Sequence, residues 1–336
     1  MRIKRQNLAT SLVKGAAYTV AAAGAAAGWW ITYSNLLIDH HVSLAKAIDA
    51  DLVRLETEAA GEVACYEDKR ASGRPLLLVH SVNAAGSSYE MGPIFSRYRM
   101  NRPVISMDLP GFGFSERSNQ LYTPRLYHEA ILEILEREVS EPVDVVALSL
   151  GCEFAARAAV IQPEKFHSLT FISPSGFSAP RKTRGSQSAS LGGRGERIYR
   201  ALSNRLWGRP LYDLIATKVS IRWFLKQSFV GPPPEDMIAY AYATSHQPGA
   251  QYAPLYFVSG KLFTQGILPA FYERLELPVQ VLFDQDAYIG FERLPEVLHA
   301  HENWQAARII PSRGLPQFER MDDVAKELDR FWAGIK

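Results

Sequence analysis

The sequence contains little cysteine and no marked excess of charge of either sign. Two cysteines, Cys65 and Cys152, occur in 336 residues, so we expect buried free thiols rather than a disulfide framework. The 37 Lys and Arg residues against 35 Asp and Glu residues leave a net charge of +2, which gives no argument for a nucleic-acid partner. A hydrophobic content of 47% is ordinary for a globular protein and argues against disorder.

The common signatures of metal and nucleotide sites are missing as well. The chain has no zinc-ligand spacing, no P-loop and no G-x-G-x-x-G motif, and it shows no internal repeat. We therefore expect neither a metal nor a cofactor. The length is sufficient to bury a large core, in one large domain or two small ones.

One stretch, residues 143–157, organises the rest of the sequence. The β-branched apolar run Val143–Leu148 predicts a strand, Ser149 follows it directly, and Glu153–Ile161 predicts a helix. A strand and a helix joined through one serine, with small residues on both sides, require a tight turn. Such a turn exposes the hydroxyl at the carboxyl end of a parallel sheet and aims the next backbone N–H at a developing oxyanion. The simpler alternative is a strand–helix junction with a serine N-cap.

The flanking pattern predicts a mostly parallel α/β sheet with helices between the strands. Four continuous apolar runs suit buried parallel strands: Leu76–His80, Pro103–Met107, Ser168–Ile172 and Pro278–Phe283. A hairpin over residues 52–67 precedes them, and a short strand over residues 307–310 follows. Between residues 177 and 276 the alternation stops, and aromatic-rich helical segments predict an inserted cap that begins with a mobile, basic loop over residues 181–200.

The N-terminal segment is apolar. Four basic residues lie within residues 1–14, and the uncharged run over residues 15–38 would span about 36 Å as a helix. Trp29, Trp30 and Tyr33 lie near its far end, where interfacial aromatics are expected. We expect a spanning or surface-bound helix and therefore a membrane-associated protein, with its N-terminus in the cytoplasm by the positive-inside rule. The alternatives are a cleaved signal peptide and a helix packed on a cytoplasmic protein.

Four segments together resemble the α/β-hydrolase superfamily. They are Leu76–Asn83, Asp108–Ser115, the stretch around Ser149 and Leu282–Tyr288. The resemblance implies a doubly wound, mostly parallel sheet of the α/β-hydrolase type. It divides the chain into an N-terminal apolar helix over 1–45, a core over 50–176 and 277–336, and a helical cap over 177–276.

The resemblance also assigns roles to residues. Ser149 matches the nucleophile, which in this family is followed along the chain by an acid and a histidine. Asp286 matches the acid that ends a strand after the cap, with Asp284 as the second choice. The oxyanion hole would consist of the backbone N–H groups of Leu150 and Val82. His80 corresponds to a histidine that usually has a structural role.

The histidine base is absent from its usual place. The family carries a Gly-His pair after the last strand, whereas here Leu315 follows Gly314 and no histidine occurs beyond His301. His299 and His301 precede the last strand, at the wrong end of a parallel sheet. His246 in the cap and Gln317, the nearby polar side chain of similar size, are the remaining choices for the base or its replacement. Gln317 can orient a water molecule, but it cannot accept a proton at neutral pH.

Two functions follow from this incomplete set of residues. In the first, the protein is a serine hydrolase that acts on an ester-type apolar small molecule through Ser149 and Asp286, with the base unassigned. In the second, it is a catalytically impaired family member, a pseudo-hydrolase, that binds an apolar ligand or a partner near a membrane. A serine hydroxyl without an adjacent base is a weak nucleophile, so the base decides between them.

Overall fold

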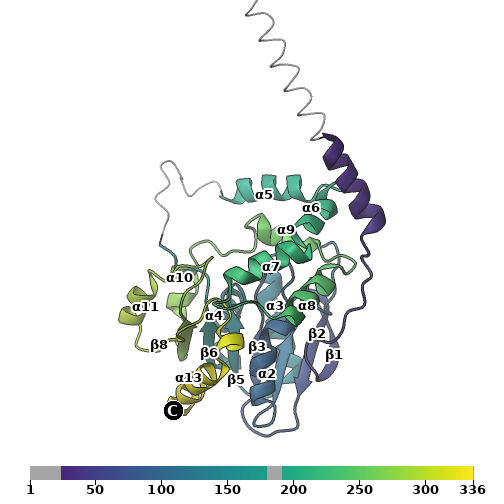
Figure 1. The fold of residues 1–336 in the computed structure, drawn as a ribbon. Helices are drawn as coiled ribbons and strands as arrows, with labels where there is room; N and C mark the ends of the chain where they lie inside the picture. The colour runs from purple at the N-terminus through teal and green to yellow at the C-terminus, as the bar shows by residue number, and fades with distance from the viewer. Residues whose placement is uncertain (1–23, 180–190, 336) are drawn as a thin grey trace, which may run out of the picture.

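The computed structural model describes residues 24–179 and 191–335 and contains an eight-stranded sheet. The strands are β1 (Asp51–Thr57), β2 (Gly61–Asp68), β3 (Leu76–Val79), β4 (Val104–Met107), β5 (Val143–Leu148), β6 (Phe166–Ile172), β7 (Val279–Phe283) and β8 (Trp304–Arg308). Their order in the sheet is β1-β2-β4-β3-β5-β6-β7-β8 (Figure 1). The β1–β2 and β2–β4 pairs are antiparallel, and every later pair is parallel. The predicted sheet, with its edge hairpin, is therefore confirmed.

Helices cover the sheet and also form the segment inserted between β6 and β7. Apart from the N-terminal helix, the helices outside this insertion are α2 (Gly92–Tyr98), α3 (Pro124–Glu138), α4 (Gly151–Ile161), α11 (Leu294–Ala300), α12 (Pro316–Glu319) and α13 (Met321–Gly334), with the short η1 (Ser88–Met91) and η2 (Pro163–Lys165). The inserted helices are α5 (Leu191–Leu202), α6 (Gly208–Ile215), α7 (Lys218–Gln227), α8 (Glu235–Ser245), α9 (Tyr252–Val258), α10 (Ile267–Ala270) and η3 (Tyr272–Arg274).

The inserted helices lie over the carboxyl end of the parallel strands. Figure 1 shows α5 to α9 above one end of the sheet. Contacts with loops that follow strands identify this end: the Tyr212 hydroxyl on α6 donates to Ala84 O at 2.7 Å, and Arg117 donates to Thr244 Oγ1 on α8 at 3.1 Å. Ala84 follows β3 and Arg117 follows β4, so the insertion covers the edge where ligands bind in α/β sheets.

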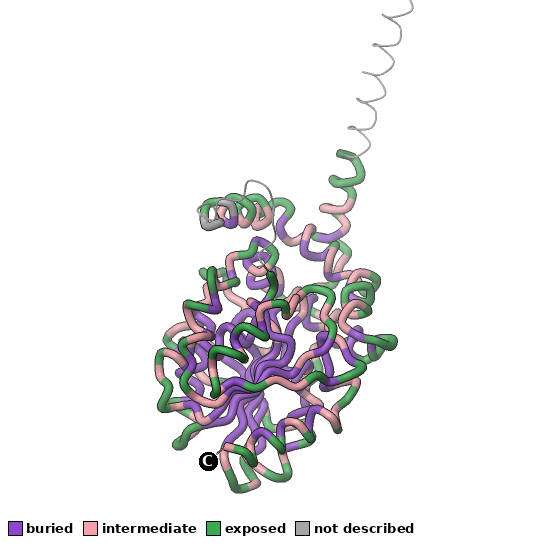
Figure 2. Tube along the Cα trace, turned by 90° about the vertical axis from the view of Figure 1, so that its left-hand side faces the viewer, coloured by how far each residue is buried: buried purple, intermediate pink, exposed green. Residues whose placement is uncertain are grey.

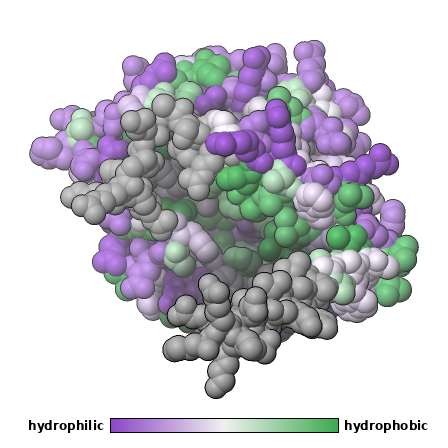
Figure 3. Space-filling model, turned by 90° about the horizontal axis from the view of Figure 1, so that it is seen from above, coloured by the Kyte–Doolittle hydropathy of each residue, from purple (hydrophilic) through white to green (hydrophobic). Residues whose placement is uncertain are grey.

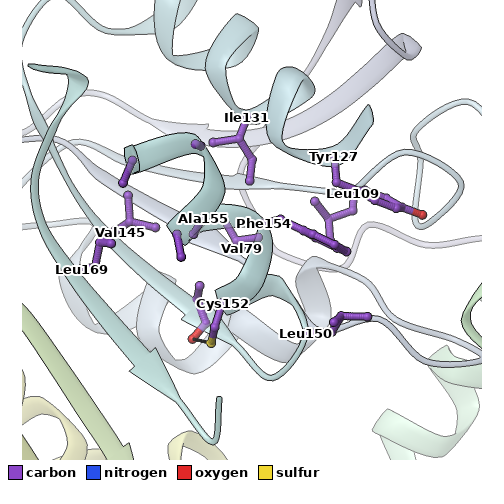
Figure 4. Packing of buried hydrophobic residues seen from close by; sticks show 14 of the residues in the cluster. Val79, Leu109, Tyr127, Ile131, Val145, Leu150, Cys152, Phe154, Ala155 and Leu169 are labelled. Atoms are coloured by element: carbon purple, nitrogen blue, oxygen red, sulfur yellow. Dashed lines mark hydrogen bonds between the residues drawn. The ribbon is translucent and has the colours of Figure 1, made fainter. Parts of the chain in front are cut away.

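The central strands are buried because helices pack on both faces of the sheet. Every residue of β3, β4 and β5 is buried, which explains why these strands are apolar except at Ser106 and Asp144 (Figure 2). On one face, Phe154 of α4 stacks on Tyr127 of α3 with ring centroids 4.5 Å apart, in the same apolar cluster as Val79 and Val145 (Figure 4). The helix that follows Ser149 is therefore held rigidly against the strand that precedes it.

The N-terminal helix is described only from residue 24 and ends at residue 37. Trp30 Nε1 donates to Pro210 O at 2.8 Å, and Ser34 Oγ donates to Asp213 Oδ2 at 2.6 Å, so the helix contacts α6. Among the described residues, no helix has the length and apolar character needed to cross a membrane. The first part of the expected apolar run, residues 15–23, lies outside the described residues, so the spanning helix is not confirmed.

Two sequence-based assignments of secondary structure were wrong. The second half of the expected mobile loop, from residue 191, belongs to α5; residues 181–190 lie outside the described part of the chain. The last strand is β8, Trp304–Arg308, three residues before the start expected from the run at Ala307. His301 still precedes it, as the C-cap of α11, and so remains at the amino end of the strand.

Candidate active site

Ser149 occupies a strained turn between β5 and α4. Its φ is +53°, a conformation that residues other than glycine rarely adopt. Gly151 permits this turn, because a Cβ at that position would lie 2.5 Å from His80 O. The backbone of Ser149 is bonded on both sides, since its N–H donates to Ile172 O at 2.9 Å and its carbonyl accepts from Cys152 N at 3.2 Å. The turn therefore has the geometry of a nucleophile elbow rather than of a simple N-cap.

The amides of Leu150 and Val82 are available as donors. Within the described residues, neither N–H group donates to any acceptor, although both side chains are buried. Buried amides without partners are uncommon and invite a functional explanation. Leu150 is the N-cap residue of α4, so a negative charge beside its amide is also favoured by the helix dipole. These features suit an oxyanion hole.

His80 supports the loop after β3 and is fully committed. Its Nδ1 lies 2.5 Å from Ser81 O, and its Nε2 accepts from Leu109 N at 2.8 Å. A neutral ring that donates through Nδ1 satisfies both contacts. Burial lowers the pKa of His80 to about 4, so the ring stays uncharged near neutral pH. Both ring nitrogens are occupied, which excludes His80 as a base toward Ser149.

Of the two aspartates after β7, Asp286 faces the loop where the family carries its histidine. Its Oδ1 accepts from Tyr288 N at 2.7 Å and Ile289 N at 3.1 Å. Its Oδ2 would lie 2.8 Å from a Cβ built on Gly314. Burial raises the pKa of Asp286. Asp284 is instead bound to Arg308 at 2.5 Å, which gives it a structural role.

No base lies within hydrogen-bond distance of Ser149 Oγ in residues 24–179 and 191–335. Gln317 is fully buried, and its Nε2 donates to Glu90 O at 2.9 Å while its Oε1 has no partner in this part of the structure. Leu315, which follows Gly314, packs into the apolar cluster around α2 and α13. The C-terminal loop therefore brings an aliphatic side chain, and not a proton acceptor, to the position after Gly314.

His246 belongs to a different cluster, near the N-terminal helix. Its Nδ1 lies 2.8 Å from Tyr242 O, and its ring stacks on Tyr242 with centroids 3.9 Å apart. The other flank faces His40 with centroids 6.0 Å apart, and His40 Nε2 lies 2.9 Å from Asp213 Oδ2. Burial lowers the pKa of His246. Its contacts tie the inserted helices to the N-terminal segment and do not include Ser149.

A hollow of about 330 Å³ lies beside the elbow. Glu153 and Ser175 line it from the side of Ser149, and Tyr288 and Ile289 line it from the loop that binds Asp286. Ser175 N donates to Ser149 O at 3.4 Å, but Ser149 itself does not line the hollow. The Glu153 carboxylate accepts from Ser175 Oγ at 2.6 Å, and burial raises its pKa. Sequence reasoning missed this buried acid, because a glutamate at the start of a helix is common.

The sheet, the strained serine after β5 and the two free amides together define a protein of the α/β-hydrolase class. The sequence pattern of the alpha/beta hydrolase family matches residues 76–327, and the chain belongs to this family. It is 30% identical over 126 residues to a 2-hydroxymuconate semialdehyde hydrolase of Pseudomonas putida, a match that covers 37% of this chain and 44% of that one. The chain spans less than half the length of the curated relatives that it matches.

Solved structures show the same fold at low sequence identity. A bacterial membrane phospholipase A superposes with a TM-score of 0.66 at 18% identity, over 100% of this chain and 99% of that one. A carboxylesterase from Bacillus subtilis superposes with a TM-score of 0.62 at 15% identity, over 85% and 92% of the two chains. At such identities the likeness defines the fold and leaves the substrate open.

Proposed function

We propose that the protein is a slow serine hydrolase of ester-type, apolar small molecules. Ser149 Oγ would attack the acyl carbon, and the amides of Leu150 and Val82 would receive the oxyanion. The observation that supports this most strongly is the positive φ of Ser149 beside these two free amides. A strained backbone of this kind costs on the order of 1–3 kcal/mol and is typical of functional sites.

The missing base sets the expected rate. Loss of a triad member costs on the order of 10⁴ to 10⁶ in rate, while an oxyanion hole and binding alone retain about 10³ to 10⁴ over water. Asp286 would act as the acid of the site, but no histidine connects it to Ser149 in the described residues. The serine proton would pass through water to the leaving alkoxide, which would depart as the alcohol when the acyl-enzyme forms. A water molecule would then hydrolyse the acyl-enzyme, releasing the acid and regenerating Ser149.

The alternative is a pseudo-hydrolase that binds an apolar ligand. It is favoured by the buried Leu315 at the position after Gly314. In both functions, the inserted segment over residues 177–276 would act as a cap that bounds the ligand. The domain division and the roles of Ser149 and Asp286 are part of this proposal.

Turnover of a short-chain p-nitrophenyl ester, measured in wild type and Ser149→Ala, separates the two functions. A hydrolase gives slow turnover that the substitution abolishes, together with labelling of Ser149 by a fluorophosphonate probe. Equal background rates in both proteins and no labelling would establish the pseudo-hydrolase.

The N-terminal segment supports a further part of the proposal, association with a membrane through residues 15–38. Trp29, Leu36 and Leu37 on the described helix are all more than half exposed. Apolar side chains also gather on the face of the molecule seen in Figure 3. Val219 and Trp223 of α7 are exposed as well. Flotation with anionic vesicles tests this: the full chain should float, and Trp29→Ser with Leu37→Ser should float less. Flotation that these substitutions leave unchanged would contradict it.

A further inference from the structure

Glu90 is a buried carboxylate beneath the loop that carries Val82. It belongs to η1 and is 6% exposed. Its Oε2 accepts from Ser81 N at 2.9 Å, and its Oε1 accepts from Asn83 Nδ2 at 2.8 Å. The carboxylate therefore binds the two residues that flank Val82, the donor assigned to the oxyanion hole. Asn83 Nδ2 also donates to Ser81 Oγ at 2.9 Å, which closes the loop on itself.

The charge of Glu90 is not neutralised by a cation among the described residues. The ionisable residue that follows β3 is the neutral His80, and the carboxylate that follows β4 is Asp108, which accepts from Ser88 N at 2.7 Å. The charged residue of α2 is the exposed Arg97, and α12 contributes the uncharged amide of Gln317. Burial raises the pKa of Glu90 to about 7, although the hydrogen bonds from Ser81 and Asn83 act in the opposite direction.

The donors around Glu90 fit only its ionised form. An ionised carboxylate accepts through both oxygens, whereas a carboxylic acid carries one O–H donor. The loop presents an N–H group from Ser81 and an N–H group from Asn83. The O–H group of a protonated Glu90 would therefore face one of these N–H donors, and no hydrogen bond could form there. Protonation should therefore release one side of the loop.

We propose that Glu90 is a positioning residue whose carboxylate fixes the Ser81–Asn83 loop so that the amide of Val82 faces the oxyanion formed at Ser149. This inference rests on the proposed function of Ser149. It makes the oxyanion hole depend on a side chain that does not touch the substrate. The loop is correctly placed when Glu90 is ionised and is loosened when Glu90 is protonated.

As the pH rises, the ionisation of Glu90 should lower the stability of the fold and raise the reactivity of Ser149. A carboxyl group whose pKa is raised by folding stabilises the fold below its unfolded pKa, and this stabilisation is lost as the pH rises through the folded pKa. Ionisation of Glu90 thus weakens the fold between pH 4.5 and about 7, while it strengthens the oxyanion hole. A carboxylate with a purely structural role would change both properties in the same direction.

The test compares wild type, Glu90→Gln and a matched control, Glu133→Gln, in the full chain. Glu133 also binds two amides of one turn, Glu58 N at 2.6 Å and Ala59 N at 2.9 Å, but in the β1–β2 hairpin. The rate of Ser149 labelling by a fluorophosphonate is measured from pH 5.5 to 8.5, and Tm is measured over the same range.

We expect the ratio of wild-type to Glu90→Gln labelling rates to rise from near one at pH 5.5 to about tenfold or more at pH 8.5. The wild-type Tm should fall relative to that of Glu90→Gln over the same range, and Glu133→Gln should label like wild type. A ratio that is constant with pH, or an equal loss in Glu133→Gln, would overturn the role of Glu90 alone. Absence of labelling in wild type would refute the proposed function, and the role of Glu90 with it.

Discussion

Replacing Leu315 by histidine should supply the base that the site lacks. Leu315 follows Gly314, and Asp286 Oδ2 lies against Gly314 and has no hydrogen-bond partner in the described residues. An imidazole at residue 315 would therefore have a carboxylate within reach of Nδ1, while Nε2 would be free to accept the proton of Ser149. Asp286 would hold the ring in the tautomer that a general base requires.

The size of the gain follows from two opposing effects. Loss of a triad member costs on the order of 10⁴ to 10⁶, or about 5.5–8 kcal/mol of barrier. A misplacement of about 1 Å costs on the order of 10²-fold, so an unoptimised histidine should recover roughly 10² to 10⁴. Removing the buried leucine costs about 1.5–3 kcal/mol of stability, which a domain with 5–15 kcal/mol should tolerate.

Initial rates of p-nitrophenyl ester hydrolysis provide the assay. The rate of Leu315→His should rise as the imidazole loses its proton, near pH 6.5 for an unperturbed histidine. Gln317→His is the comparison, and we expect a smaller gain because Gln317 is directed to Glu90 O. An unchanged rate in a folded Leu315→His protein, or a gain that survives Ser149→Ala, would refute the reasoning.

Three further predictions concern stability. Gly151→Ala should destabilise the fold and reduce Ser149 labelling, because its Cβ would lie 2.5 Å from His80 O; chemical denaturation and labelling measure this, and a wild-type midpoint would contradict it. The pKa of His80 is lowered by burial to about 4, so its contribution to stability is lost as the pH falls from about 6.5 to 4; the free energy of unfolding should drop by up to about 3 kcal/mol, and a curve that is flat over this range would contradict the assignment. Ser34→Ala should increase proteolysis near the N-terminal helix because Asp213 loses a donor, whereas Thr32→Ala on the exposed side should not; equal cleavage of both variants would argue against the contact.

The sequence was most informative where local chemistry decides the structure. The helix over Pro124–Glu138 has local start signals in its sequence, because Thr123 Oγ1 accepts from Leu126 N and proline occupies its first position. The turn at Ser149 was predictable for the same reason, since a strand and a helix meet there with only small residues between them. Asp286 lies three residues after the end of β7, and its role as the acid stays a prediction. These features depend on neighbours in the sequence.

The features that were missed depend on contacts between distant segments. Glycine and arginine in α5 gave no helical signal, but Tyr199 packs on Tyr256 of α9 with centroids 4.0 Å apart, and Lys261 pairs with Glu196 at 2.5 Å. His246 was a candidate base because the sequence does not show which way its side chain points. In the structure, its ring contacts Tyr242 and not Ser149. Glu90 carries no motif, and its importance is visible only when the loop after β3 is in place.

Asp213 Oδ2 accepts from Ser34 Oγ and also contacts His40 Nε2, so the chain between residues 34 and 40 is closed into a loop on α6. A force that pulls on the chain at residue 24 would therefore act on α6 through Asp213 before it acted on β1. If the N-terminal segment is anchored, motion of the anchor would be transmitted to the inserted helices and, through the Tyr212–Ala84 hydrogen bond, to the loop after β3. The carboxylate of Asp213 therefore couples the N-terminal helix mechanically to the inserted helices.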